Sequence, residues 1–170
     1  MIRTRIQNKK AQIAGEVFIY IMSAIVIGVI ILVGYWGIST VSERQCSAEQ
    51  INFKTKIESS MERYNTYGSM NKDTFTAPCG YETVCFADAS SIGTTLDATT
   101  CKNKIVKSSV EGDVKQNIFL MSSKKVTVPM GYSEKVALED PKSCICITAK
   151  NNNFYLTFNG RGSSTVISES

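Results

Sequence analysis

The sequence predicts an α+β protein: a long N-terminal membrane-spanning helix continues into an amphipathic helix, which packs on a C-terminal antiparallel β-sheet head. Three observations support this prediction. Residues 17–41 carry no charged side chain. Apolar residues then recur at helical spacing between residues 48 and 66, and beyond Gly68 the apolar pattern acquires a period of two. We expect four parts: a basic cytoplasmic leader at 1–11, a transmembrane helix at 12–41, an amphipathic helix at 42–66 and an extracellular disulfide-bonded head at 67–170.

The uncharged run is long enough to cross a membrane. At about 1.5 Å per helical residue it exceeds a hydrocarbon core of about 30 Å, and it is longer than a signal-peptide core of about 7–15 residues. No acidic residue occurs among the first fifteen, whereas four basic residues precede the run: Arg3, Arg5, Lys9 and Lys10. An excess of basic residues marks the cytoplasmic side. We therefore expect a single-pass protein with its N-terminus in the cytoplasm and its C-terminal part outside.

The residues just before the run form a recognisable pattern. A dibasic pair, Lys9-Lys10, is followed by Ala11, Gln12 and, five positions into a chain that begins at Gln12, by Glu16. This pattern resembles the class III signal peptide of archaeal type IV pilins and pilin-like proteins. The resemblance implies cleavage between Ala11 and Gln12 by a prepilin peptidase on the cytoplasmic side, with the apolar helix kept on the mature protein. The family usually has glycine before the cut, where this chain has Ala11.

Glu16 has two interpretations. A charge costs roughly 2.5–3.5 kcal/mol at the centre of a membrane helix and less toward its end, so an intramembrane carboxylate usually has a partner or a function. In a filament of such helices, that partner is the freed α-amino group of Gln12 on a neighbouring subunit. Alternatively, Glu16 lies at the interface beside Lys9 and Lys10, wetted by lipid headgroups. Helix physics alone does not choose between the two.

Composition excludes several function classes. The net charge is +4, but four of the 19 basic residues precede the run, which leaves 15 Lys/Arg against 14 Asp/Glu from Ser42 onward. The exterior part is thus nearly neutral, and we expect no nucleic-acid partner. The chain has no histidine, the commonest general base and metal ligand. We expect no enzymatic activity and no cofactor or metal.

The cysteines all lie on the predicted exterior side, where the compartment is oxidising. They are Cys46, Cys79, Cys85, Cys101, Cys144 and Cys146. An even number in such a compartment predicts up to three disulfides, for which 15 pairings are possible. The spacings differ from those of common zinc sites. Cys144-x-Cys146 also fits a redox dithiol, but on a strand its two side chains would share one face and be tied to different partners.

The amphipathic stretch is predicted to pack on the head. Phe53, Ile57, Met61 and Tyr64 follow one another at steps of four, four and three, among charged neighbours. This spacing forms one apolar stripe of a helix. We expect Gly68 to cap its C-terminus. If the helix runs unbroken from Gln12 to Asn65, it resembles the spine of a pilin; the alternative is two helices with a break near Cys46.

The head is predicted to consist of short strands. Strands at 74–77 and 82–87 flank a Pro78–Tyr81 turn, and a small, hydroxyl-rich loop occupies 89–100. A hairpin is expected from 117–121 and 124–129, followed by a three-stranded meander from 144–149, 154–158 and 165–168. The segment 104–106 is too short to assign.

Two features of the head invite a binding role. Arg161 between two glycines suits an anion-binding loop, although a solvated turn arginine explains the same residues. Tyr81, Tyr132 and Tyr155 are candidates for exposed adhesive aromatics.

The expected function is structural: a subunit of a pilus-like cell-surface filament, major or minor, built with identical or related subunits through the apolar helix. The alternative is a membrane-anchored extracellular binding module that never polymerises.

Overall fold

The computed structural model describes residues 9–123 and 125–170, and their side chains except at residues 9–16 and 39–43. Its architecture is α+β, as predicted: an N-terminal apolar helix is followed by β-sheets with mostly antiparallel strands. The chain divides into two compact units, with the boundary between Gln45 and Cys46. All the strands belong to the second unit, Cys46–Ser170, which is hereafter the head unit.

Among the described residues there are two α-helices and two short 3-10 helices. They are α1 (Lys9–Arg63), α2 (Lys104–Glu111), η1 (Pro78–Gly80) and η2 (Ala89–Ser91). The α2 helix begins at residues 104–106, for which the sequence pattern predicts no element. The side chain of Asn103 caps it by accepting hydrogen bonds from the backbone N–H groups of Ile105 and Val106 at 3.0 and 3.1 Å. Val106 and Val110 bury its apolar side.

The first sheet, hereafter sheet 1, has the strand order β1-β7-β8-β5. Its strands are β1 (Met70–Thr76), β7 (Asn153–Gly160), β8 (Thr165–Glu169) and the very short β5 (Val136–Ala137). The β7 strand is antiparallel to both of its neighbours, β1 and β8, whereas β5 runs parallel to β8. Phe154, Leu156 and Phe158 of β7 are completely buried, and Tyr155 between them is exposed. This alternation was expected of a strand with one core face.

The second sheet, hereafter sheet 2, has the strand order β4-β3-β2-β6 and is fully antiparallel. Its strands are β2 (Thr83–Ala87), β3 (Ile118–Met121), β4 (Val128–Gly131) and β6 (Cys144–Thr148). The predicted hairpin is present as β3 and β4, although its second strand starts later than expected. The register shifts between Ile118 and Phe119, and Pro129 lies on edge strand β4, where a missing N–H is tolerated.

The prediction of a three-stranded C-terminal meander is wrong. The β7 and β8 strands pair, but β6 pairs with β2 in the other sheet, and only an isolated bridge joins Lys150 to Asn153. Asn151 and Asn152 adopt positive φ angles of 52° and 60°, so the chain does turn where expected. The period of two indicates which side chains face a core, but it does not indicate which strand supplies the hydrogen bonds.

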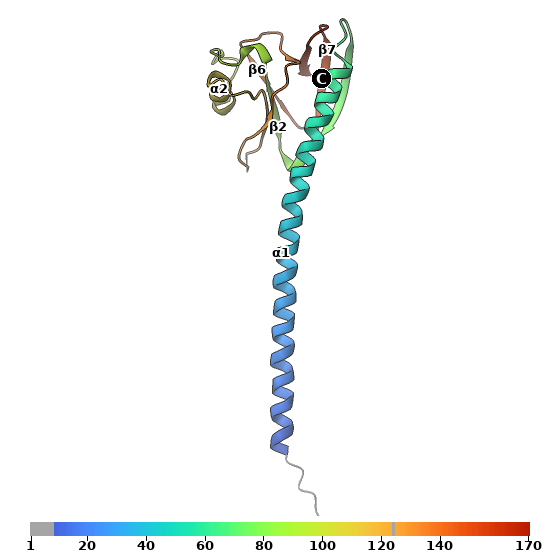
Figure 1. Ribbon diagram of the computed structural model, residues 1–170, viewed down its shortest axis with the longest axis vertical. Coiled ribbons are helices and arrows are strands. Elements are labelled where there is room, and N and C mark those ends of the chain that lie inside the picture. Colours follow the sequence, from blue (N-terminus) through green and yellow to red (C-terminus); the bar gives the residue numbers. More distant parts are fainter. Residues whose placement is uncertain (1–8, 124) are drawn as a thin grey trace, which may run out of the picture. The chain divides into compact units, whose positions relative to one another are not determined.

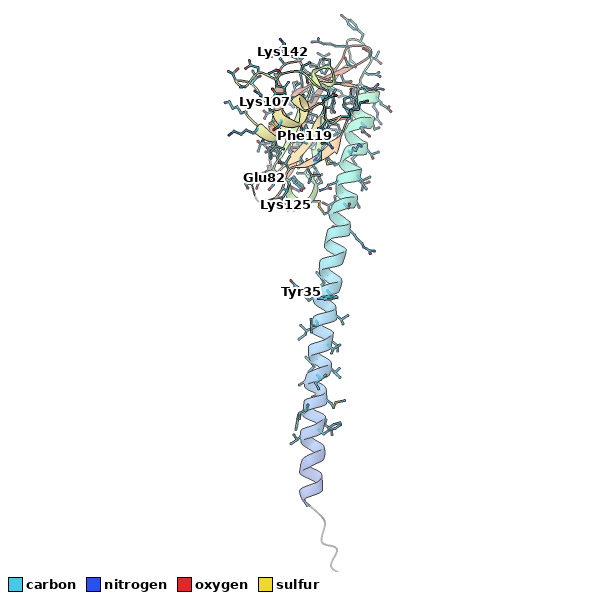
Figure 2. The ribbon with its side chains drawn as sticks, turned by 60° about the vertical axis from the view of Figure 1, so that its left-hand side comes forward. Tyr35, Glu82, Lys107, Phe119, Lys125 and Lys142 are labelled. Carbon is cyan, nitrogen blue, oxygen red and sulfur yellow. A yellow bond between two sulfur atoms is a disulfide. The ribbon has the colours of Figure 1, made fainter. Side chains whose placement is uncertain are left out.

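The core of the head unit places the end of α1 against sheet 1. Phe53, Ile57 and Met61 are at most 4% exposed. The ring of Phe53 lies 5.6 Å from that of Phe154 and 6.2 Å from that of Phe75, centroid to centroid. In Figure 1, β7 lies beside this end of α1, and α2 lies near β6. A second, smaller cluster joins α2 to sheet 2 through Val106, Val110 and Phe119, the last of which is labelled in Figure 2.

The chain leaves α1 earlier than expected. The helix ends at Arg63, five residues before Gly68, which lies in the following turn with φ 77°. Two backbone hydrogen bonds join that turn to the end of β7. The N–H of Gly68 donates to the carbonyl of Gly160 at 3.0 Å, and the N–H of Gly160 donates to the carbonyl of Ser69 at 2.8 Å. Gly68 therefore serves the helix-to-strand connection rather than the helix end.

Candidate assembly surface

The apolar part of α1 exposes its whole circumference. Val17–Ile38 is a 22-residue segment of mean hydropathy 2.8, and among the described residues it is the one helix long and apolar enough to cross a membrane. Every side chain in it is exposed, from 47% at Met22 to 74% at Ile38 for the large apolar ones. Tyr35, labelled in Figure 2, is 73% exposed. A helix that is hydrophobic all round normally lies in a core or in lipid.

The few polar and small residues of this segment do not interrupt the apolar surface. The hydroxyl of Ser23 donates to the carbonyl of Tyr20 at 2.9 Å, so it is satisfied within the helix. A Cβ added at Gly28, Gly34 or Gly37 would meet nothing within 4 Å. These glycines therefore offer shallow positions at which another backbone can approach, as small residues do between membrane helices.

The predicted leader and assembly residues are only partly described. Lys9, Lys10, Ala11, Gln12 and Glu16 belong to α1 by their backbone, and their side chains lie outside the described part of the structure. Two further topology residues, Arg3 and Arg5, lie outside the described residues altogether. Cleavage after Ala11 and the pairing of Glu16 therefore stay predictions.

The predicted disulfides are present and use all six cysteines. The pairs are Cys46–Cys79, Cys85–Cys146 and Cys101–Cys144. Each closes a different part of the head unit: the first joins α1 to η1, the second joins β2 to β6 across the ladder, and the third ties the loop before α2 to β6. The two cysteines of the Cys-x-Cys motif have different partners, as expected for alternate side chains on one face of a strand.

The Cys46–Cys79 disulfide is part of a larger junction between α1 and η1. The N–H of Cys79 donates to the carboxylate of Glu49 at 2.8 Å. The ammonium of Lys125 donates to the carbonyl of Cys79 and lies 5.4 Å from the ring centroid of Tyr81. Figure 2 shows Lys125 and Glu82 at the same end of the head unit. The junction holds α1 on the head before its first fully buried side chain, Phe53.

The candidate adhesive aromatics differ in exposure. Tyr81 is only 6% exposed and belongs to the core, so its selection as an exposed aromatic was wrong. Its side chain packs in the main core cluster, directly after η1. Tyr132 is half-buried and Tyr155 is 37% exposed. Among the described residues, the most exposed tyrosine of the head unit is Tyr67, at 85%, which no sequence pattern singles out.

Arg161 lies in a turn, as one of its two interpretations expected. Its N–H donates to the carbonyl of Ser164 at 2.9 Å, and the next residue, Gly162, has φ 92°. Gly162 also donates its N–H to the carbonyl of Asn65 at 2.7 Å. The glycines are therefore explained by the backbone of the β7–β8 connection, and Arg161 is exposed beside it.

One ionisable group in the loop before α2 has a perturbed pKa. Hydrogen bonds from the backbone N–H and the hydroxyl of Thr99, both at 2.9 Å, lower the pKa of the exposed Asp97 carboxyl. The nearby Lys107 adds a smaller effect in the same direction. The ionised carboxylate accepts these hydrogen bonds more strongly than the protonated carboxyl does, so the bonds favour the charged form within this turn.

The surface that the described residues offer is thus an exposed apolar helix and a disulfide-bonded β-rich head. Within the described part of the chain, no group of three or more Cys, Asp or Glu side chains is placed to hold a metal ion. Comparisons with protein-family models, with curated proteins and with solved structures find no match to this chain.

Proposed function

We propose that the chain is a structural subunit of a type IV pilus-like surface filament of the archaeal kind. In this proposal a prepilin peptidase removes residues 1–11, the N-terminal helix first lies in the membrane, and the mature subunit then assembles with identical or related copies through that helix. The head unit faces outward and provides subunit contacts and adhesion. The role is structural and not enzymatic.

The observation that carries the proposal is the exposure of an apolar helix on all its sides. At about 1.5 Å per residue, Val17–Ile38 is about 33 Å long, which matches the hydrocarbon core of a bilayer. Side chains such as Ile30, Val33 and Ile38 are each more than 60% exposed. Lipid covers such a surface before assembly, and helices of neighbouring copies cover it afterwards. A simple anchor needs only the first of these environments.

The residues before the helix distinguish the filament from a simple anchor. The dibasic pair Lys9-Lys10, the small residue Ala11 and the acidic Glu16 at the fifth position after the expected cut form one combined pattern. Cleavage would create a new α-amino group at Gln12. That amine can pair with Glu16 of a neighbouring subunit, which removes the cost of an isolated carboxylate at the membrane.

The head supports a role outside the cytoplasm. Three disulfides persist where the environment is oxidising. The near balance of basic and acidic residues from Ser42 onward avoids strong repulsion between heads that are stacked side by side. Both features suit a head that is exported and packed at high density.

The deciding experiment is the identification of the mature N-terminal residue. We would isolate the protein from membranes of its native host and combine intact mass with sequencing of the terminal peptide. A chain that begins at Gln12 supports the filament subunit. A chain that still begins at Met1 contradicts it and leaves the alternative, an anchored binding module, for which the alanine in place of glycine before the cut is the favouring observation.

A further inference from the structure

One of the three disulfides has an exposed end. Cys146 is exposed, whereas its partner Cys85 is completely buried. The cysteines of the other two disulfides are buried or half-buried: Cys101 and Cys144 are 2% and 9% exposed, and Cys46 and Cys79 are half-buried. A thiol in solution can therefore reach the Cys85–Cys146 disulfide more easily than the other two, and it reaches it at Cys146.

The exposure arises because the cover that α2 provides for sheet 2 ends within β6. Cys85 lies in the smaller core cluster with Val106 of α2 and with Phe119, which is labelled in Figure 2. Cys144 belongs to the same cluster. Cys146 follows two residues later on the same face of β6 and lies outside that cluster. A hollow of about 440 Å³ borders both Cys144 and Cys146, so a small molecule has room beside the exposed end of the disulfide.

The lining of this hollow does not repel a thiolate, which is the nucleophilic form of a thiol. Besides the two cysteines, the lining consists of Thr100, Lys102, Asn103 and Met121. None of these described side chains is acidic, and Lys102 is basic. A negatively charged sulfur that enters the hollow therefore meets no like charge on its walls.

The disulfide can open while the strands that it joins stay paired. Cys85 and Cys146 are direct partners in the antiparallel ladder of β2 and β6, which spans Thr83–Ala87 and Cys144–Thr148 and thus continues on both sides of the disulfide. The neighbouring Phe86 is completely buried in the main core cluster. Backbone pairing and core packing therefore hold β2 against β6 when the covalent bond is broken.

The sulfur that is released on opening has a neighbour suited to its reduced form. Sγ of Cys85 lies 3.3 Å from Sδ of Met121. In the disulfide Sγ carries no hydrogen, whereas the thiol formed on opening can donate its S–H to the thioether, a weak acceptor. Reduced Cys85 can thus stay where it lies in the core.

We propose that Cys146 is a modification site at which a low-molecular-weight thiol exchanges with the Cys85–Cys146 disulfide. The thiolate attacks Sγ of Cys146, and a new S–S bond forms as the bond to Cys85 breaks. The electron pair of the broken bond stays on Sγ of Cys85, which takes a proton from water. The small thiol is oxidised and Cys85 is reduced. Attack by Cys85 on the mixed disulfide reverses the exchange and expels the small thiol.

This modification goes beyond filament assembly through the apolar helix and does not depend on cleavage of the leader. If a second small thiol attacks the first one in the mixed disulfide, it leaves Cys146 as a free thiol and produces a disulfide of the two small molecules. The number of free thiols on the protein therefore reports the exchange.

The test treats the full chain in detergent micelles with reduced glutathione. Exchange is stopped with acid at successive times, the chain is unfolded, and its free thiols are alkylated and located by tandem mass spectrometry. Free thiols should appear at Cys85 or Cys146 at least tenfold faster than at the other four cysteines. Amide hydrogens of residues 83–87 should stay protected from exchange with solvent. Equal rates at the three disulfides, or faster opening of Cys46–Cys79, overturn the proposal.

A matched pair of variants identifies the sulfur that is attacked. Cys85→Ser leaves Cys146 without its partner, and this exposed thiol should form an adduct with oxidised glutathione. Cys146→Ser leaves the buried Cys85 instead, which should react at least tenfold more slowly. Circular dichroism checks that both variants keep the fold. No adduct in Cys85→Ser, or equal rates in the two variants, contradicts the assignment to Cys146.

Discussion

The carboxylate of Glu49 on α1 accepts a hydrogen bond from the backbone N–H of Cys79 over 2.8 Å, beside the disulfide that joins Cys79 to Cys46. Both contacts bind α1 to η1. They act on the stretch Cys46–Asn52, which has no fully buried side chain, since burial starts at Phe53. The start of the helix in the head unit is therefore held by a covalent bond and a charged hydrogen bond instead of by core packing.

Removing this disulfide should loosen that stretch selectively. Cys46→Ser combined with Cys79→Ser opens a loop with a sequence separation of 33 residues. The chain-entropy relation then predicts that the free energy of unfolding falls by roughly 3–4 kcal/mol. Amide hydrogen exchange should accelerate most in residues 47–52. The matched control removes Cys101–Cys144 and should accelerate exchange near α2 instead. Unchanged exchange at 47–52 would show that the disulfide does not hold the helix.

Beyond this stretch, core packing attaches α1 to sheet 1. Phe53 is 4% exposed and contacts the rings of Phe75 and Phe154, whereas Ile51, two residues earlier, is 63% exposed. Phe53→Ala should lower the free energy of unfolding by about 3–5 kcal/mol because it leaves a cavity between α1 and the sheet. Ile51→Ala should change it by less than about 0.5 kcal/mol. Thermal unfolding of the full chain in detergent measures both; equal effects would contradict the assigned packing.

Much of this architecture follows from sequence patterns. The uncharged run predicts the apolar helix, and an even number of cysteines on the expected exterior side predicts that they pair. The pairing of the strands cannot be predicted from these sequence patterns. The β6 and β7 strands are consecutive and separated by an asparagine turn, yet they belong to different sheets, because β6 completes a ladder with β2, 61 residues away at the Cys85–Cys146 disulfide. Local pattern carries no information on such distant partners.

The candidate functional surfaces also include some that the sequence predicts and some that it does not. Glu16 and the leader were selected from sequence alone, because their pattern is local. A hollow between α1 and β1, lined by Asn52, Lys56 and Phe75, was missed because it depends on how the helix lies against sheet 1. The α2 helix was also missed, although Asn103 and the spacing of Val106 and Val110 were available signals of a capped amphipathic helix.

The connection from α1 to β1 leaves no room for a side chain at Gly160. A Cβ at this position would overlap the carbonyl oxygens of Tyr64 and Thr66, which belong to the turn after the helix. Gly160→Ala should therefore cost about 1–3 kcal/mol of unfolding free energy. Gly28→Ala is the control, because a Cβ there meets nothing within 4 Å. Thermal unfolding curves of the two variants give the comparison, and a neutral Gly160→Ala would contradict the close packing of this turn.

The turn at Asp97 should respond to pH in one direction. Because the hydrogen bonds from Thr99 lower the pKa of Asp97 in the folded state, they stabilise the turn above the ordinary aspartate pKa of about 3.9. That stabilisation is lost as the pH falls through the lower folded-state pKa. Thr99→Val removes the hydroxyl and should raise the pKa of Asp97 toward the ordinary value. A carboxyl-carbon NMR titration measures both proteins; identical titration curves would show that the hydroxyl has no role.

The proposed pairing of Glu16 with the new N-terminus predicts a specific assembly defect. Glu16→Gln keeps the shape of the side chain but removes the charge that would pair with the α-amino group of Gln12, so each added subunit loses one ionic contact near the membrane. Filaments counted by electron microscopy on the native host should fall at least tenfold. The control is Glu43→Gln, which removes an acidic charge beyond the uncharged run and should leave filaments unchanged. Leader cleavage, followed by intact mass, should persist in both variants. Normal filaments from cleaved Glu16→Gln subunits would refute the ionic pairing while leaving the filament itself in place.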